Sequence, residues 1–388
     1  MIESIGDALR MAAAMGWEIL WPLILGFTLS GVIQAVVRRE QVTRRLAGDS
    51  PRHLAWATGL GAASSSCSYA AVALARSLFR KGASLSAAMA FEIASTNLVI
   101  ELGIILALLM GWQFTLAEFI GGPIMIVLVA LAFRLWMRGR IVEAAREQAE
   151  RGVAGSMEGH AAMDMSVQRE GTLWQRLFSE EGFTSVAHCY VMDWASVIRD
   201  IVLGLLIAGA FAAWIPTHWL QVFFTGDPAA AKLWGPLIGP LVAVVSFVCS
   251  VGNVPLAAVL WNDGIGFGGV ISFIFADLII VPIILIYRKY YGTRAALRIT
   301  GIFYLAMAGA GYVVELLFTP LGLIPQHRSA TVVEASFSWN HTTWLDLAFL
   351  LLSTILLVRF IRTGGLPMLR MMGGAPDAQE HAETGDSL

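Results

Sequence analysis

The sequence predicts an all-α polytopic membrane protein made of two inverted repeats, with about seven transmembrane helices and two re-entrant helical hairpins. Composition is the first reason: 57% of the 388 residues are hydrophobic, 14% are charged, and the mean hydropathy is +0.69. A soluble core could not hide so much apolar surface. An internal duplication around a cysteine–serine pair and a one-sided distribution of Lys and Arg supply the other two observations.

Apolar runs long enough to cross a bilayer, which takes about 20 helical residues, recur along the chain. Helices are expected because the alternation over about ten residues that is typical of membrane barrels is absent. The first 15 residues have no basic n-region or cleavage pattern, so we expect no removable signal peptide and a retained first helix. The runs lie near 16–37, 115–137, 193–214, 266–287, 296–318 and 343–361.

A cysteine–serine pair occurs twice inside apolar segments, at Cys67-Ser68 and at Cys249-Ser250. Aligned from the two cysteines without a gap, nine of 29 positions are identical. Duplicated halves with interrupted apolar segments in matching places indicate the substrate site of a secondary transporter. Gly and Pro in the stretch 249–255 predict a helix break there.

Segments 53–79 and 234–261 are predicted to be re-entrant hairpins that turn at these pairs. Under that topology 23 of the 26 basic residues are cytoplasmic, the N-terminus is outside and the C-terminus is inside. The alternative, nine full spans, divides the basic residues about evenly and fits the positive-inside rule poorly. The residues left outside are Arg10, Lys232 and Arg328.

These elements divide the chain into five parts. They are a first membrane repeat at 1–137, a cytoplasmic linker at 138–190, a second membrane repeat at 191–318, an extra transmembrane helix at 319–365 and a tail at 366–388. Within the linker, the mixed charges of 140–151 predict an amphipathic or solvated helix. The polar tail is expected to be disordered.

The two predicted turns are expected to face one cavity, because non-helical backbone at membrane depth needs cover from protein or water. Thiolates are soft ligands, and hydroxyls and amides add polar contacts without fixed charge. Such a pocket suits a small thiophilic or neutral polar solute, although a lone buried cysteine can also serve for packing alone. The predicted substrate-binding residues are Ser66, Cys67, Ser68, Asn97, Cys249, Ser250 and Asn253.

Two acids at membrane depth, Glu92 and Asp277, are the candidates for proton coupling. Intramembrane acids are costly and usually functional, although a structural acid hydrogen-bonded at a helix break is the alternative. No phosphate-binding GxxxxGK[ST] loop is present, so we expect an ion gradient rather than ATP to drive transport.

A cluster in the linker, Met157, His160, Met163 and Met165, is a weak candidate for soft-metal binding. A flexible charged linker that happens to contain methionines is the alternative. We expect no cofactor and, from the net charge of −2, no nucleic-acid partner. The expected partners are membrane lipid, the transported solute and protons; the oligomeric state is left open.

At its cysteine–serine segments the chain resembles the ArsP/YraQ-type permeases, in which such a motif precedes a Pro-Leu step, a basic residue with Gly, and an Ala/Leu-rich helix. The matching residues are Ser66, Cys67, Ser68, Arg80, Lys81, Gly82 and Ala83, then Cys249, Ser250, Pro255, Leu256 and Gly264. The resemblance implies efflux of toxic thiophilic solutes, such as trivalent organoarsenicals, by proton exchange across the bacterial inner membrane.

The first half departs from that family pattern. Ser65 and Ser66 stand where a doubled Cys-x-Cys is common, and Ala73 stands where Pro is expected. Capture of arsenic by two thiols of one turn is therefore excluded. Cys67 would have to act together with Cys249, or the substrate is a different solute.

Two other functions fit the same residues. A membrane thiol–disulfide carrier could cycle Cys67 and Cys249 between dithiol and disulfide and pass electrons across the bilayer. A permease of unrelated specificity would use the cysteines only for packing. The leading interpretation is a transporter and not an enzyme.

Overall fold

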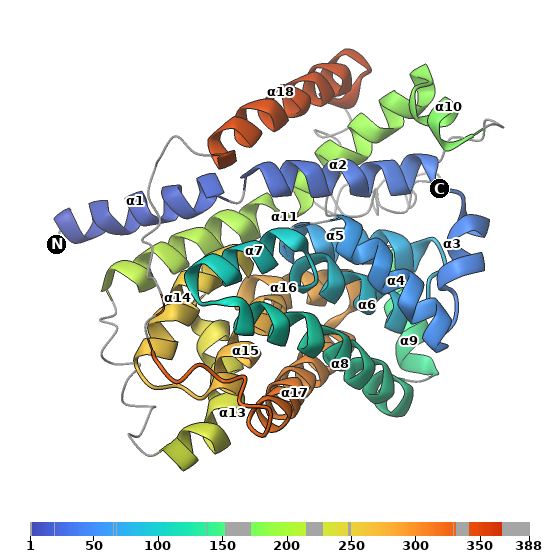
Figure 1. Cartoon of the computed structure of the whole chain (residues 1–388). Coiled ribbons are helices and arrows are strands. Elements are labelled where there is room, and N and C mark those ends of the chain that lie inside the picture. Colours follow the sequence, from blue (N-terminus) through green and yellow to red (C-terminus); the bar gives the residue numbers. More distant parts are fainter. Residues whose placement is uncertain are drawn as a thin grey trace, which may run out of the picture.

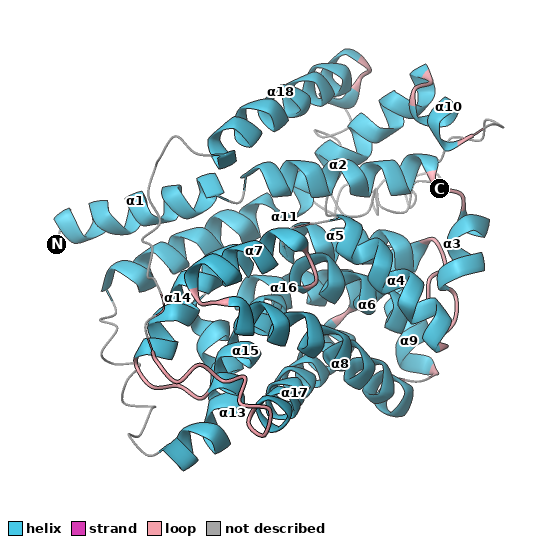
Figure 2. Cartoon of the chain, in the orientation of Figure 1, coloured by secondary structure: helices cyan, strands magenta, loops and turns pink. Residues whose placement is uncertain are grey.

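The computed structural model describes residues 2–18, 20–64, 66, 68–137, 139–151, 172–214, 228–246, 250–328, 330 and 341–366. All regular structure in this part of the chain is helical, as predicted (Figure 2). The helices form one bundle with α1 and α18 at its edge (Figure 1). Cys67 and residues 247–249 lie outside the described residues. Neither cysteine–serine turn is therefore described completely.

The first half of the chain contains eight helices in the described residues. They are α1 (Ile2–Glu18), α2 (Leu20–Val36), α3 (Arg39–Leu46), α4 (Pro51–Ser64), α5 (Ser68–Arg80), α6 (Leu85–Asn97), α7 (Ile100–Leu109) and α8 (Trp112–Trp136). The rest contains α9 (Arg140–Arg151), α10 (Leu173–Leu177), α11 (Glu180–Trp214), α13 (Pro228–Ser246), α14 (Ser250–Asn262), α15 (Phe267–Phe275), the 3₁₀ turn η2 (Ala276–Leu278), α16 (Val281–Tyr291), α17 (Thr293–Phe318) and α18 (His341–Arg362).

Helix α11 begins earlier than the apolar pattern predicts. The run was expected from residue 193, but the helix begins at Glu180. Ser179 caps it by accepting a hydrogen bond from the backbone of Gly182 at 3.0 Å, and two glutamates in its first turn favour the helix dipole. The stretch 138–190 is therefore partly helical, and its predicted helix at Arg140–Arg151 is confirmed as α9.

Helices α4 and α5 are here called the first hairpin, and their outer ends meet. Ser84, just after α5, donates its backbone N–H to the carbonyl of Leu46 at 2.7 Å and its hydroxyl to the carbonyl of Gly48 at 3.1 Å, just before α4. Both arms pack on α6. With 14 and 13 residues, each arm is about 20 Å long, which is shorter than the roughly 30 Å hydrocarbon core.

Helices α13 and α14, the second hairpin, both pack on α15, but α13 has 19 residues and at about 28 Å is longer than either arm of the first hairpin. A Cβ atom built on Gly235, near the start of α13, would lie 3.4 Å from the backbone nitrogen of Gly266, just after α14. The predicted non-helical turn at 249–255 is wrong in part, because α14 already begins at Ser250 and contains Pro255. Pro255 is the sixth residue of α14, beyond the first turn, and it removes one backbone hydrogen bond of the helix there.

The helix after each hairpin is broken, and in the second half the break interrupts the predicted apolar run 266–287. Helices α6 and α7 meet at 40°, and α15 with η2 meets α16 at 45°. At the first break, Ser95 donates its hydroxyl to a backbone carbonyl at 2.9 Å, a bond that competes with the helix. At the second, Pro282 lies at the start of α16 and restricts the residue before it.

Three described helices are long and apolar enough to cross a membrane, and up to six spans result if each bent pair counts as one. The three are Trp112–Trp136, Thr293–Phe318 and Thr343–Arg362. Large apolar side chains also cover the outer surface: Ile100, Leu108, Leu316 and Leu351 are 63–76% exposed. This distribution is typical of lipid contact, while the total of seven spans stays a prediction.

The ends of the two hairpins match in detail at positions 182 residues apart, the offset between the two cysteine–serine pairs. Gly82 and Gly264 end α5 and α14 with φ of 101° and 113°, a left-handed conformation that favours glycine. Each donates to the carbonyl three residues earlier, at 3.1 Å and 3.2 Å. The helix ends are therefore built in the same way.

An arginine holds each of these ends. Arg146 donates to the carbonyls of Phe79 and Ala83 at 2.5 and 2.8 Å, and its guanidinium lies 4.1 Å from the Phe79 ring centroid. Arg328 lies 182 positions later and donates to the carbonyls of Trp261 and Ile265 at 2.6 and 2.9 Å, with its guanidinium 4.3 Å from the Trp261 ring centroid. We call these contacts the arginine clamps. The first joins Arg146 to Phe79 and Ala83, and the second joins Arg328 to Trp261 and Ile265.

Candidate functional site

The start of the first hairpin's second arm reaches the helix break of the other half. Ser68, the first residue of α5, donates its hydroxyl to Oδ2 of Asp277 in η2 at 2.6 Å. The backbone N–H of Ser66 donates to the carbonyl of Ser95 in α6 at 2.9 Å. The hydroxyl of Ser68 and the carboxylate of Asp277 are fully buried. The turn of the first hairpin therefore contacts both broken helices.

A second acid–hydroxyl pair crosses between the halves in the opposite sense. Tyr287 of α16 donates its hydroxyl to Oε1 of Glu92 in α6. Both side chains are fully buried, and Oε2 of Glu92 has no hydrogen-bond partner among the described residues. Each of the two predicted coupling acids thus receives a hydroxyl from the other half.

Buried amide and hydroxyl atoms without described partners lie along the same elements. Asn97, two residues after Ser95, donates to the hydroxyl of Thr96 at 3.1 Å, but its Oδ1 has no partner among the described residues. The same holds for Oγ of Ser66 and for both amide atoms of Asn253. Unpaired buried polar groups cost about 1–3 kcal/mol each, so such atoms are suited to bind a polar solute.

The structure thus brings Ser66, Ser68 and Asp277 together and places Asn97 and Glu92 within about one turn of Ser95 on α6. Asn253 is buried in the first turn of α14. The side chains of the remaining predicted residues lie outside what the structure describes, so their roles stay predictions. They are Cys67, Cys249, Ser250, Met157, His160, Met163 and Met165.

Comparison with known proteins decides the family. Residues 4–316 match the model of the ArsP_1 family, whose description is predicted permease. The chain belongs to the ArsP_1 permease family. The match covers both hairpins, both broken helices and both acids, and it ends before α18.

Two relatives of this permease are known by name. Rv2963 of Mycobacterium tuberculosis, whose name describes it as a permease, is 66% identical over 379 residues, which cover 97% of this chain and 93% of that protein. The UPF0718 protein YraQ of Escherichia coli K12 is 22% identical over 303 residues, covering 76% and 78%. No solved structure matches the chain. The permease is a multi-pass membrane protein of a transporter family, and the predicted resemblance is confirmed.

Two acids of the permease that bear on its packing, the buried Glu118 and the half-buried Asp193, were missed from the sequence, as were the buried acids Glu315 and Asp346. Glu118 is fully buried in α8. Asp193 of α11 accepts hydrogen bonds from Ser30 at 2.6 Å and Gln34 at 2.9 Å, both on α2. Each acid lies inside or at the edge of a predicted apolar run, so the rule that an intramembrane acid is functional by default would have found them.

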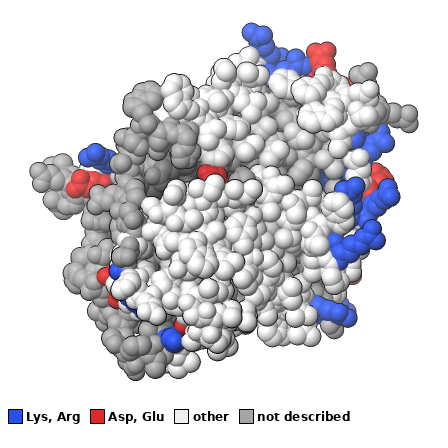
Figure 3. Space-filling view, viewed as in Figure 1, with Lys and Arg blue, Asp and Glu red and all other residues white. Residues whose placement is uncertain are grey.

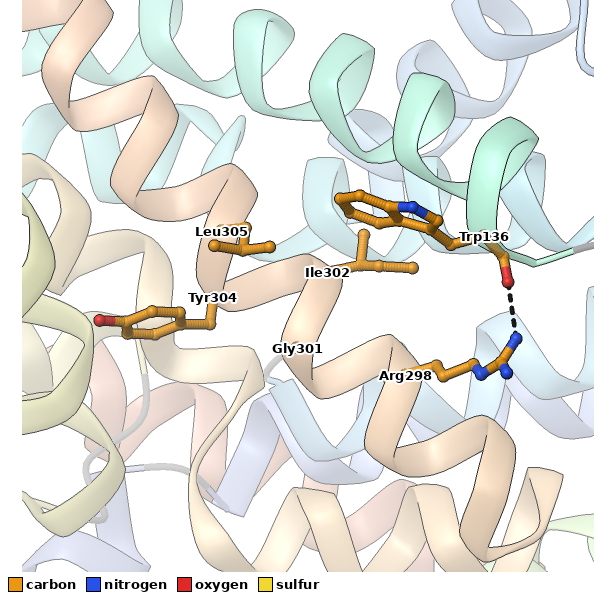
Figure 4. Close-up of a pocket in the computed structure, with 6 residues that line it drawn as sticks. All are labelled: Trp136, Arg298, Gly301, Ile302, Tyr304 and Leu305. Carbon is orange, nitrogen blue, oxygen red and sulfur yellow. Dashed lines mark hydrogen bonds between the residues drawn. The ribbon is translucent and has the colours of Figure 1, made fainter.

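No group of three or more His, Cys, Asp or Glu side chains that could hold a metal ion occurs in the described part of the permease. A groove of about 530 Å³ lies apart from the acids, between α8 and α17 (Figure 4). It is lined mainly by apolar atoms, and Arg298 at one end donates to the carbonyl of Trp136 at 2.8 Å. Trp136 and Leu305 are each more than half exposed, which is typical of a groove that faces lipid.

Proposed function

We propose that this permease is a secondary-active exporter of a small thiophilic solute: a metalloid, a soft metal or an organic derivative of one. Export is driven by exchange with protons. The solute binds near the membrane midplane, at the interface between two inverted repeats. The observation that carries the proposal is the crossed pair of buried hydrogen bonds, Ser68 to Asp277 and Tyr287 to Glu92, which joins the halves at their helix breaks.

Inverted repeats are supported by features that recur at an offset of 182 residues: the hairpins, the glycine ends and the arginine clamps. Packing between the halves is reciprocal, since α5 lies against α16 and α14 lies against α7. In an inverted arrangement the two hairpins enter from opposite sides. Seven spans and two re-entrant hairpins then account for the chain.

The orientation with the C-terminus inside is supported by the distribution of charge. Lys and Arg gather at one end of the molecule, over α3, α9 and the C-terminal ends of α8 and α18, while few lie over α1, α13 and α14 (Figures 1 and 3). Basic residues are enriched on the cytoplasmic side of membrane proteins. The first hairpin then enters from the cytoplasm and the second from outside.

The chemistry of the proposed site combines soft and polar groups. Cys67 and Cys249 supply one thiol from each half, and the hydroxyls and amides of the neighbouring residues hold the rest of the solute. Asp277 accepts the Ser68 hydroxyl in its ionised form. When Asp277 takes up a proton, it loses part of its strength as an acceptor, and the contact between the hairpin and the broken helix weakens. Proton uptake and release of the solute are linked in this way.

The test is a resistance and uptake panel in a metal-sensitive bacterial host, covering arsenite, methylated arsenicals, antimonite, mercury, copper and silver. Expressing cells should tolerate more of at least one compound and accumulate less of it. The double variant Cys67→Ala/Cys249→Ala should lose the effect, while Cys189→Ala should keep it, because Cys189 is a buried side chain on α11. If no compound distinguishes expressing cells from empty cells, the proposal is wrong.

The same panel separates the alternative functions. A permease in which the cysteines only pack would give a double variant as active as the parent chain. The thiol–disulfide carrier gains no support from the described residues or from the named relatives, and we do not propose it.

A further inference from the structure

Glu118 differs from the other buried glutamates of the long helices. It lies in the second turn of α8, it is fully buried, and neither carboxylate oxygen has a hydrogen-bond partner among the described residues. Glu315 on α17 is also buried, but it accepts the backbone N–H of Gly268 at 2.6 Å, at the start of α15. Glu315 therefore caps a helix, whereas Glu118 has no such structural role in the described part of the chain.

The face of α8 that carries Glu118 covers both helix breaks. Residues three or four positions apart share a helix face. One turn after Glu118, a Cβ atom on Gly121 would lie 2.8 Å from the ring of Phe275, the last residue of α15. A Cβ atom on Gly122 would lie 2.5 Å from Leu98, which ends α6. The two glycines allow α8 to approach both breaks closely.

The acids nearest to this face of α8 lie on the two breaks that it covers. Asp277 of η2 comes two residues after Phe275, whose ring the Gly121 position approaches, and Glu92 lies on α6, which packs against α8. Glu315 on α17 and Glu101 on α7 are the other acids on helices that pack against α8. Two buried carboxylates that interact cannot both stay ionised at low cost, so one of them retains a proton.

We propose that Glu118 is a third proton-binding residue of the transport path and that it shares one proton with Asp277. In the described conformation Glu118 holds the proton and Asp277 is ionised, because Asp277 receives the Ser68 hydroxyl. Transfer moves one proton from Glu118 to Asp277 and leaves Glu118 ionised, so charge and atoms balance. The inference rests on the proposed proton exchange, and it adds the residue from which Asp277 is protonated.

Labelling with dicyclohexylcarbodiimide tests the proton site without any solute, since this reagent attaches to protonated carboxyl groups in apolar surroundings. In the purified full-length protein, mass spectrometry of peptides should find an adduct on Glu118. The adduct should be absent in Glu118→Gln and weak or absent on Glu315, the matched buried glutamate. Size-exclusion chromatography checks that Glu118→Gln is folded. An unlabelled Glu118 between pH 5.5 and 9 overturns the proposal.

The variant Asp277→Asn tests whether the proton is shared. It removes the like charge that opposes ionisation of Glu118, so labelling of Glu118 at pH 7.5 should fall by about twofold or more. Equal labelling of Glu118 in both proteins contradicts sharing. Labelling that behaves as expected while the solute panel is silent would support this inference and refute the exporter. If Glu118→Gln exports a panel compound with an unchanged pH profile, that result would support the exporter and refute this inference.

Discussion

At the scale of single residues, the two buried acids Glu92 and Asp277 are each joined to a hydroxyl that comes from the opposite half of the chain. Ser68 and Asp277 are 209 residues apart, and Tyr287 and Glu92 are 195 residues apart. Bonds of this kind couple the protonation of one acid to contacts between the halves. A buried bond to a charged acceptor contributes about 1.5–3 kcal/mol, so its loss is measurable.

Removing the Tyr287 hydroxyl should destabilise the protein. Tyr287→Phe leaves Glu92 without its described donor, and we expect a loss of about 1–3 kcal/mol, seen as a lower thermal unfolding temperature in detergent. Tyr291→Phe is the matched control, because the buried Tyr291 hydroxyl one turn later has no partner among the described residues. Equal effects of the two variants would contradict the role assigned to the Glu92 contact.

Variants of Asp277 and Ser68 should affect proton coupling and folding stability to different degrees. Asp277→Asn keeps an uncharged oxygen that accepts the Ser68 hydroxyl more weakly, so it should lower the unfolding temperature less than Ser68→Ala does, while export against a pH gradient is lost. Ser68→Ala removes the donor and should cost about 1–3 kcal/mol. The measurements are thermal unfolding and pH-dependent uptake in inverted vesicles, using the panel compound that is found. A stable, fully coupled Asp277→Asn protein would refute the role of this acid.

The acids after the hairpins could be predicted at this scale because a carboxyl group inside an apolar run is conspicuous. Their partners could not, since nothing local connects Glu92 to a tyrosine 195 residues away. Glu118 and Asp193 lie outside the segments that directly follow the cysteine–serine pairs, on which the prediction of the other two acids rests. The substrate-binding roles of the Cys67 and Cys249 thiols stay predictions.

At the scale of elements, the hairpins and the broken helices define the architecture around the site. The duplicated cysteine–serine pairs predicted where the hairpin arms end, and α4 and α5 do end and begin around the first pair. Pro255 does not end a helix as predicted, since α14 contains it as its sixth residue and loses one backbone hydrogen bond there. The breaks after α6 and α15 were not predicted, because their apolar runs are continuous and the backbone changes direction only at residues such as Asn97 and Pro282.

Replacing either clamp arginine by lysine should lower stability. A lysine ammonium cannot bridge two carbonyls in the fixed geometry of a guanidinium, so Arg146→Lys and Arg328→Lys should each cost about 1–3 kcal/mol. Arg298→Lys is the control, because Arg298 donates to one exposed carbonyl, that of Trp136. Thermal unfolding in detergent measures all three. If the clamp variants behave like the control, the arginines do not hold the hairpin ends.

At the scale of the whole molecule, an apolar outer surface and a basic end characterise the protein (Figure 3). Composition and charge were sufficient to predict a multi-pass helical protein, because the bilayer imposes length and orientation rules on every span. The number of spans was harder to predict, since short arms, bent pairs and full spans have similar apolar composition. Only packing distinguishes them.

The inverted arrangement predicts that the two hairpin ends lie on opposite sides of the membrane. In a background without the native cysteines, Lys81→Cys should react with an impermeant maleimide only in inverted vesicles. Asp263→Cys should react in intact cells. Arg44→Cys and Arg10→Cys serve as inside and outside references. Reaction of both hairpin ends from the same side would contradict the proposed topology.

The equal spacing of Arg146 and Arg328 from their hairpins bears on how such a chain could arise. A polypeptide of half the length, ending shortly after one arginine, would already carry a hairpin, a broken helix and the residue that fastens them. Two such molecules inserted in opposite orientations could assemble the same core without being joined. Fusion of the two genes would then fix their ratio and orientation, and each half could afterwards specialise, so that its acid lies at a different position of the broken helix.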